Sequence, residues 1–116
     1  MSSAKKSENK KVYIAGPITG LPNYNFAEFD RAAAIIGARG LEAMNPAEIG
    51  RKWLIDHAHK EPNASEYQDL LSAGREQLRQ CGRIYLLRGW EKSKGALSEL
   101  SYALIMGLQV ELEVAE

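Results

Sequence analysis

Short apolar runs alternate along the chain with longer stretches of helical spacing. Residues 12–15 form an apolar run that ends at a Gly-Pro pair, the pattern of a buried strand that stops at a loop. Three later runs are predicted as strands for the same reason, at 41–44, 84–87 and 108–114. A helical stretch separates each predicted strand from the next.

The helical stretches carry their own start and stop signals. Apolar residues on one face predict a first helix, and they are Phe26, Phe29, Ala33 and Ile36. Asn25 and Glu28 are expected to cap its start, and Gly40 is expected to end it. A weaker helix is predicted over 47–60, and Asn63 with Glu66 predicts the cap of a longer one.

A last helix is predicted over 95–106, ended by Gly107. The residues expected on its buried side are Leu97, Leu100, Ala103 and Leu104. Strands that alternate with helices favour parallel pairing through right-handed crossovers. We therefore expect one doubly wound, Rossmann- or flavodoxin-like α/β domain over 12–116, with four to five parallel strands, helices on both faces and the first strand central. Residues 1–11, rich in Ser and Lys, are expected to be a flexible tail.

Composition and charge argue against several classes of function. The chain has 15 basic and 15 acidic residues, a balance that argues against binding to a nucleic acid polymer. No apolar run is long enough to cross a membrane, so a cytoplasmic protein is expected. Cys81, the single cysteine, is expected to be a buried thiol. His57 and His59 lack the partners of a metal motif, so no metal site is expected.

Two loops should face each other where the strands end, which is where open α/β sheets bind ligands. One is GPITGLPNY after the first strand, and the other is RGWEKSKG before the last helix. The first is explained equally well by a plain tight turn. Glu99, in the last helix, is explained equally well by the preference of acids for helix starts. Neither signal alone decides the function.

Taken together, however, the segments YIAGPITG, Asn45-Pro46 and LLRGWEKSKGALSELSYALIMG carry a family resemblance. They resemble the small bacterial and phage-type branch of the nucleoside 2-deoxyribosyltransferase-like family, which is related to 2-deoxynucleoside 5-phosphate N-hydrolases. The resemblance runs from about residue 12 to residue 110, and its most specific part is the pattern GW..S.GA..E...A..G.

The resemblance implies a chemistry. Glu99 matches the glutamate that attacks the anomeric carbon of a 2-deoxyribosyl group and releases a nucleobase. Tyr13 matches the tyrosine beside that nucleophile, although a strand tyrosine also suits a core. Water or a second base would then resolve the intermediate, so the implied enzyme is a hydrolase or a transferase acting on a deoxynucleoside or deoxynucleotide. No cofactor is implied, and homologues of this fold are usually homodimers or larger.

Further residues are candidates for substrate binding. Ser93 and Gly95 match the segment that holds a 5-phosphate in relatives, but Ser93 also suits a helix cap. Trp90 either stacks on a base or fills a gap at the rim, and Asn45 contacts either the ligand or its own turn. The loop after the first strand contributes the other candidates, Gly16, Pro17 and Thr19.

The chain departs from the family pattern at two positions. Relatives commonly carry an aspartate just before the third strand and another about two helical turns earlier, and Gly82 and Gly74 stand at those places. A positioned general acid contributes about a hundredfold to ten thousandfold in rate. Two hypotheses therefore remain open, an N-glycosidic enzyme and a non-catalytic nucleotide-binding module.

Overall fold

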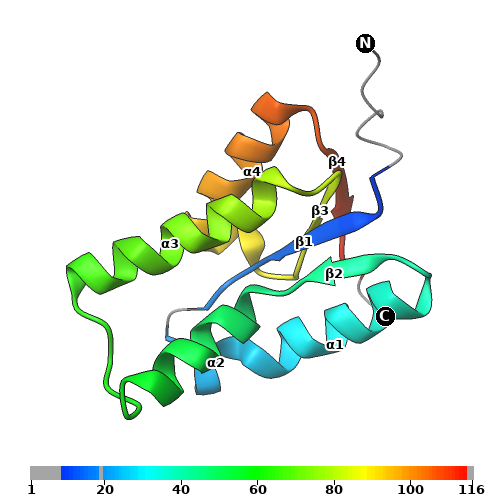
Figure 1. Ribbon diagram of the computed structural model, residues 1–116. Helices are drawn as coiled ribbons and strands as arrows, with labels where there is room; N and C mark the ends of the chain where they lie inside the picture. Colours follow the sequence, from blue (N-terminus) through cyan, green and yellow to red (C-terminus); the bar gives the residue numbers. More distant parts are fainter. Residues whose placement is uncertain (1–8, 19, 115–116) are drawn as a thin grey trace.

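The computed structural model describes residues 9–18 and 20–114. In this part of the chain, four parallel strands form one sheet in the order β2-β1-β3-β4 (Figure 1). The strands are β1 (Lys11–Ala15), β2 (Glu42–Met44), β3 (Arg83–Leu86) and β4 (Gln109–Leu112). The predicted α/β fold with a central first strand is confirmed, and β1 shares the centre with β3.

Helices cover both faces of this sheet. They are α1 (Phe26–Ala38), α2 (Pro46–Asp56), α3 (Ala64–Arg79) and α4 (Lys94–Met106), with short 3-10 turns at η2 (Pro22–Asn25) and η3 (Trp90–Lys92). Alternate residues of β1 point to opposite faces, so Val12 and Ile14 pack with α1 while Tyr13 and Ala15 pack with α3 and α4. Helix α2 contacts both α1 and α3, which places it between the two helical layers.

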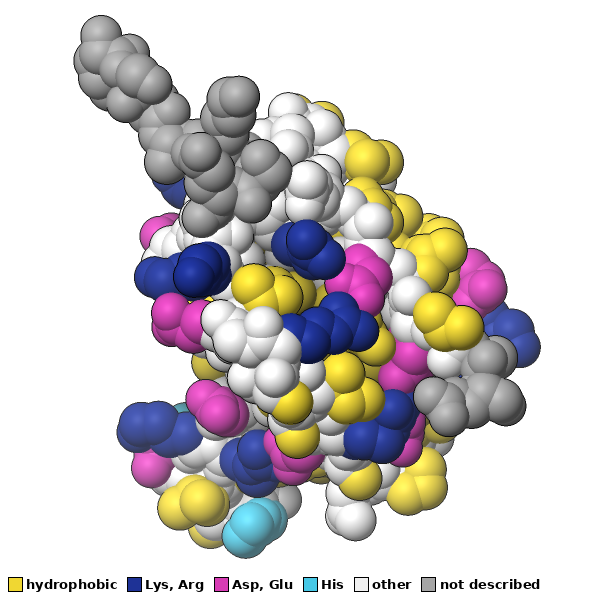
Figure 2. Space-filling model, turned by 90° about the vertical axis from the view of Figure 1, so that its right-hand side faces the viewer, with side chains coloured by type: hydrophobic (Ala, Val, Ile, Leu, Met, Phe, Trp, Pro, Cys, Tyr) yellow, Lys and Arg dark blue, Asp and Glu magenta, His cyan; other side chains and the backbone are white. Residues whose placement is uncertain are grey.

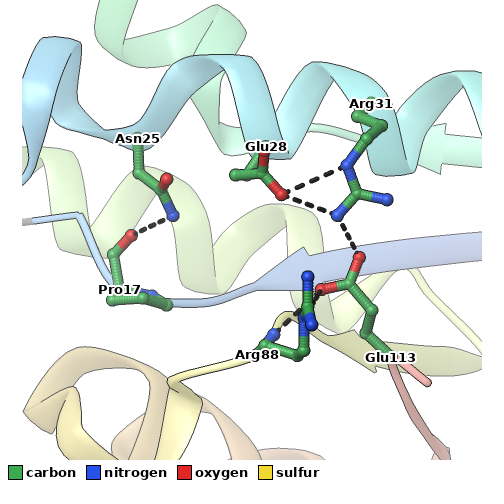
Figure 3. Close-up of polar contacts among 6 residues, drawn as sticks. All are labelled: Pro17, Asn25, Glu28, Arg31, Arg88 and Glu113. Carbon is green, nitrogen blue, oxygen red and sulfur yellow. Dashed lines mark hydrogen bonds and ion pairs between the residues drawn. The ribbon is translucent and has the colours of Figure 1, made fainter. Parts of the chain in front are cut away.

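The start of α1 differs from the prediction. Asn25 precedes the helix as expected, but its backbone is left-handed (φ 61°) and its side chain caps no helical amide. Its amide nitrogen instead donates to the carbonyl oxygen of Pro17 at 2.9 Å (Figure 3). Glu28 pairs with Arg31 one turn later rather than with the cap. Asn25 therefore fastens the loop after β1, a role that local spacing does not reveal.

The buried face of α4 also differs from the prediction. Ala96 and Ala103 are its fully buried residues, whereas Leu97 and Leu104 are 40% and 59% exposed. Small side chains let the helix lie close to the sheet, and the longer leucines consequently face outward. Gly107 ends the helix in a left-handed conformation, as predicted.

The predicted tail ends earlier than residue 11. Lys11 is the first residue of β1, and Asn9 donates from its side chain to the carbonyl oxygen of Gln80 at 2.9 Å. Residues 1–8 of that prediction lie outside the described residues. The domain therefore includes Lys11 and is anchored to α3 through Asn9.

A buried carboxylate holds the segment that follows β4. Glu113, whose side chain is 5% exposed, accepts a hydrogen bond from the backbone nitrogen of Arg88 at 3.0 Å and also pairs with the guanidinium group of Arg31 (Figure 3). These contacts connect α1, the end of β3 and the end of β4. The carboxyl edge of the sheet is thus held together on the α1 side.

Candidate functional site

A cavity of about 300 Å³ opens at the carboxyl ends of β1 and β2. Its volume is within the ordinary range of small-molecule sites. Helices α2 and α3 form its walls together with the loop after β1, and the floor is made by Tyr13, Gly16 and Glu99. The position is the one expected for ligand binding in an open parallel sheet.

Tyr13 and Glu99 form a direct pair on the cavity floor. The Tyr13 hydroxyl, on β1, donates to Oε2 of Glu99, on α4, at 2.6 Å. Among the described residues no other hydrogen bond reaches this carboxylate, so Oε1 is free of a protein partner. Glu99 lies beyond the first turn of α4, which has no acidic residue. The preference of acids for helix starts therefore does not explain its position.

Burial controls the protonation of this pair. Removal from water raises the pKa of Glu99 to about 7, although the Tyr13 hydrogen bond and the positive charge of Arg75 oppose the rise. The pKa of Tyr13 is raised well above its usual value by burial and by the adjacent carboxylate. Tyr13 consequently stays a hydrogen-bond donor, and Glu99 changes charge near neutral pH.

Gly74 on α3 lies directly against the pair. A Cβ atom at this position would lie 2.8 Å from the Tyr13 hydroxyl oxygen and 3.5 Å from Oε2 of Glu99. Tyr13 is 1% exposed, and its ring is packed in the core. A side chain at residue 74 would therefore require the Tyr13 hydroxyl to shift from its present position beside Glu99.

A double-mutant cycle tests this packing. Gly74→Ala is expected to destabilise the protein by about 1 to 3 kcal/mol, because overpacking a filled site costs that much. In a Tyr13→Phe background, which lacks the hydroxyl oxygen, the same change is expected to be neutral or stabilising, since alanine is favoured over glycine in helices by about 1 kcal/mol. Urea unfolding of the four proteins measures the coupling. An equal cost of Gly74→Ala in both backgrounds would show that the hydroxyl is not what the glycine accommodates.

A second hollow adjoins Glu99 on its other side. It measures about 260 Å³ and is lined by Arg75 of α3 and by Lys94, Gly95 and Ser98 of α4, with Tyr67 and Leu71 shared with the cavity. Arg75 donates to the Ser98 hydroxyl at 3.4 Å. Two cationic side chains and the first turn of a helix make this hollow suitable for an anion.

The cavity walls hold residues that motif analysis missed. Most of them are aromatic or aliphatic, namely Ile18, Tyr24, Phe26, Phe29, Ile49, Trp53, Leu54, Tyr67, Leu70 and Leu71. In the sequence these residues are indistinguishable from core positions of amphipathic helices, because the same periodicity describes both. Arg75 and Lys94 were missed because they belong to different helices and meet only in the fold.

Three predicted binding residues, Asn45, Ser93 and Trp90, make structural contacts within the protein. Asn45 is buried, caps α2 through the backbone nitrogen of Ala47 and donates to Asp30. Ser93 caps α4 by accepting from the backbone nitrogen of Ala96 at 3.1 Å. Trp90 packs against the core cluster beneath α3 and α4.

The remaining predicted residues divide between the site and its surroundings. Gly16 lines the cavity and packs so closely on Leu87 that a Cβ atom would come within 2.7 Å of it. Gly95 lines the second hollow. Pro17 contributes its carbonyl oxygen to Asn25 and lines neither space, and Thr19 lies outside the described residues. Tyr13, Gly16 and Glu99 thus converge as predicted, while Ser93 does not.

Gly82 does not belong to the site. Its backbone nitrogen donates to the carbonyl oxygen of Lys11, and its carbonyl oxygen accepts from Gln109, both at 3.0 Å. Lys11 and Gln109 begin their strands, so Gly82 lies at the opposite edge of the sheet from the cavity. The expectation that an acid is missing from the site at residue 82 is therefore wrong, and Gly74 alone stands beside Glu99.

Comparison with protein-family models shows which family the sequence belongs to. Residues 10–112 match the model of a domain family described as a domain of unknown function, DUF4406. The chain belongs to the DUF4406 family. A search of curated protein sequences finds no significant match.

The fold of this DUF4406 domain is also that of a solved enzyme structure. It matches a 2-desoxiribosyltransferase from Leishmania mexicana with a TM-score of 0.63 and 20% sequence identity. The match covers 89% of this chain and 63% of that structure, so the chain spans less than two thirds of the relative's length. The predicted resemblance in fold to the nucleoside 2-deoxyribosyltransferase-like proteins is thereby confirmed.

Two further observations concern the described residues of this DUF4406 domain. No helix over 9–18 and 20–114 has the length and apolar character needed to span a membrane. Within the same residues, no group of three or more His, Cys, Asp or Glu side chains is arranged to hold a metal ion. The polar chemistry of the cavity floor is that of Tyr13 and Glu99.

Proposed function

We propose that this domain cleaves or transfers at the N-glycosidic bond of a 2-deoxynucleoside 5-monophosphate. The Tyr13–Glu99 pair carries the proposal, because it stands where an apolar cavity and a cationic hollow meet. A carboxylate with one unoccupied oxygen at such a junction is suited to attack a sugar carbon held between the two spaces. The fold shared with a 2-desoxiribosyltransferase supports the same chemistry.

In the proposed reaction, an oxygen of ionised Glu99 forms a bond to the anomeric carbon while the bond from that carbon to the base nitrogen breaks. The base leaves with the electron pair and takes a proton from water. Water, or a second base, then attacks the same carbon and frees Glu99. Two displacements on one carbon retain its configuration, as in retaining glycosidases. Tyr13 orients the carboxylate through its hydrogen bond to Oε2.

The two spaces fit the two ends of the proposed substrate. The aromatic and aliphatic walls of the cavity suit the faces of a nucleobase, which stack on side chains such as Trp53 and Tyr67. The hollow lined by Arg75 and Lys94 suits the phosphate. The predicted phosphate cradle thereby shifts from Ser93, which caps α4, to cations on α3 and α4.

A second candidate function is supported by Gly74. The position beside Glu99 that carries an acid in relatives holds no side chain here, and the Tyr13 hydroxyl fills the space. A domain that keeps the pocket without an acid to assist the leaving base is suited to bind nucleotides without turnover. Base release separates the two functions.

The proposal is tested by incubating the protein with a panel of 2-deoxynucleosides and their 5-monophosphates and measuring free base by chromatography. Monophosphates are expected to bind at least about tenfold more tightly than nucleosides, since a hydrogen bond to a charged group contributes about 1.5 to 3 kcal/mol. Lys94→Gln is expected to remove much of this advantage, whereas Lys92→Gln serves as the matched control because Lys92 lines neither space. Equal affinity for nucleoside and monophosphate would overturn the phosphate assignment.

The exposed apolar surface supports a homodimer or larger homo-oligomer, which we also propose. Large hydrophobic side chains are exposed along α4 and after it, at Leu97, Leu104, Ile105, Val110, Leu112 and Val114. Figure 2 shows hydrophobic side chains gathered along one side of the face that it presents. Strand β4 is also an edge of the sheet. Exposed apolar side chains in such number are typical of association sites.

A further inference from the structure

The cavity is lined by a second carboxylate that the proposed reaction leaves unused. Glu61, in the segment between α2 and α3, lines the cavity together with Pro62. Apart from Glu99, it is the one acidic residue of the described chain that does so. The other acids near α3 and η3 line neither space, namely Glu66, Asp69, Glu76 and Glu91.

Glu61 stands at the far end of the cavity from Glu99. Helix α3 runs along the wall from its capping residue Asn63 to Gly74, which touches the Tyr13–Glu99 pair. Ten helical residues between Ala64 and Gly74 rise by about 15 Å. A base whose sugar is held at Glu99 and that extends along α3 turns its outer edge toward Glu61.

No described residue occupies this carboxylate. The neighbouring Lys60 pairs with Glu66 at 3.4 Å, and Glu66 also completes the capping box with Asn63. Since those contacts use Glu66, Glu61 keeps its oxygens available to a ligand. Glu61 is exposed, and the other walls of the cavity are mainly aromatic or aliphatic, so this carboxylate is the charged acceptor that the cavity offers to a base at this end.

A carboxylate accepts hydrogen bonds and repels carbonyl oxygens. The outer edge of guanine presents a ring N–H and an amino N–H side by side, which match the two carboxylate oxygens. The outer edge of thymine or uracil presents carbonyl oxygens on both sides of its single N–H. Guanine is consequently the base whose outer edge complements Glu61 best.

We propose that Glu61 is a specificity-determining residue that selects a guanine base through paired hydrogen bonds to its ring and amino N–H groups. This inference rests on the proposed function, because it takes the sugar to lie at Glu99. Glu61 acts in binding and forms no bond to the sugar.

The test compares dGMP with dIMP, which has the same ring system without the amino group, and adds dUMP as a carbonyl-bearing ligand. Affinities are measured by calorimetry in the Glu99→Gln background, which prevents turnover. We expect dGMP to bind at least about tenfold more tightly than dIMP, in line with one charge-assisted hydrogen bond. Adding Glu61→Gln is expected to reduce that ratio to within about threefold. Glu42→Gln is the matched control, because Glu42 begins β2 at the amino ends of the strands, away from the cavity. It is expected to leave the ratio unchanged.

The outcomes separate this inference from the proposed function. Equal binding of dGMP and dIMP, or a preference that survives Glu61→Gln, overturns the role of Glu61 while nucleotide binding itself stands. A similar loss of preference in Glu42→Gln also overturns it. If none of the three nucleotides binds and the wild type releases no base from the panel, the proposed function fails, and the inference fails with it.

Discussion

Glu99→Gln is expected to lower any base release by at least about a thousandfold while leaving the fold and nucleotide binding intact. The amide has nearly the shape of the carboxylate but cannot form the glycosyl-enzyme bond, and removal of a true nucleophile costs several orders of magnitude. The Tyr13 hydroxyl retains a carbonyl oxygen to which it can donate, so the cavity floor keeps its hydrogen bond. Release of free base, normalised to folded protein by circular dichroism, measures the effect.

Glu91→Gln is the matched control for this experiment. Glu91 lies in the same loop-and-helix motif but lines neither the cavity nor the second hollow. Its variant is expected to keep the wild-type rate. Survival of base release within about tenfold in Glu99→Gln would show that another group attacks the sugar. Nucleotide binding without base release in the wild type would favour the binding module.

The second large effect concerns stability and pH. Burial raises the pKa of Glu99 in the folded protein to about 7, against 4.5 as the ordinary value. The folded state therefore binds more protons than the unfolded state between these values, and the free energy of unfolding falls as pH rises through this window. Ionisation of Glu99 costs the folded protein about 3 kcal/mol above pH 7.

Glu99→Gln removes that cost because the amide does not ionise. The variant is expected to be more stable than the wild type at pH 8, by on the order of 10 °C in melting temperature, and of similar stability near pH 4.5. Thermal unfolding across this range measures the difference, in which the contributions of other titrating groups cancel. The matched variant Glu42→Gln should follow the wild type. A difference that is constant with pH would contradict the burial of an ionisable carboxyl.

Glu99, on which both effects rest, and its partner Tyr13 lie against one glycine. Because Gly74 has no side chain, the Tyr13 hydroxyl lies directly against it and reaches Glu99. An aspartate introduced at residue 74 would therefore have to displace the Tyr13 hydroxyl from this position. Gly82 does not contact the Tyr13–Glu99 pair. Its backbone pairs with Lys11 and Gln109 at the amino ends of the strands.

The sequence by itself determined the order of the elements and the nucleophile candidate. Apolar runs that end at Gly16-Pro17 and Asn45-Pro46 mark strand ends, because Gly and Pro interrupt local structure whatever surrounds them. The capping box of Asn63 and Glu66 was also predictable, since it involves residues three apart. Tyr13 and Glu99 came from a family resemblance, and the structure joins them by a hydrogen bond.

The tertiary structure alone decided which polar residues reach the ligand space. Asn45 and Ser93 satisfy backbone amides of their own helices, while Arg75 and Lys94 meet from two different helices. Local spacing cannot distinguish a residue that caps its own helix from one that lines the ligand space. The partner of a side chain depends on how the helices pack on the sheet. The apolar wall around Trp53 and Tyr67 was hidden for the same reason, since residues that line a cavity and residues that fill a core share one periodicity. The packing of α2 and α3 leaves a cavity between them, and only this packing shows which residues line the cavity and which fill the core.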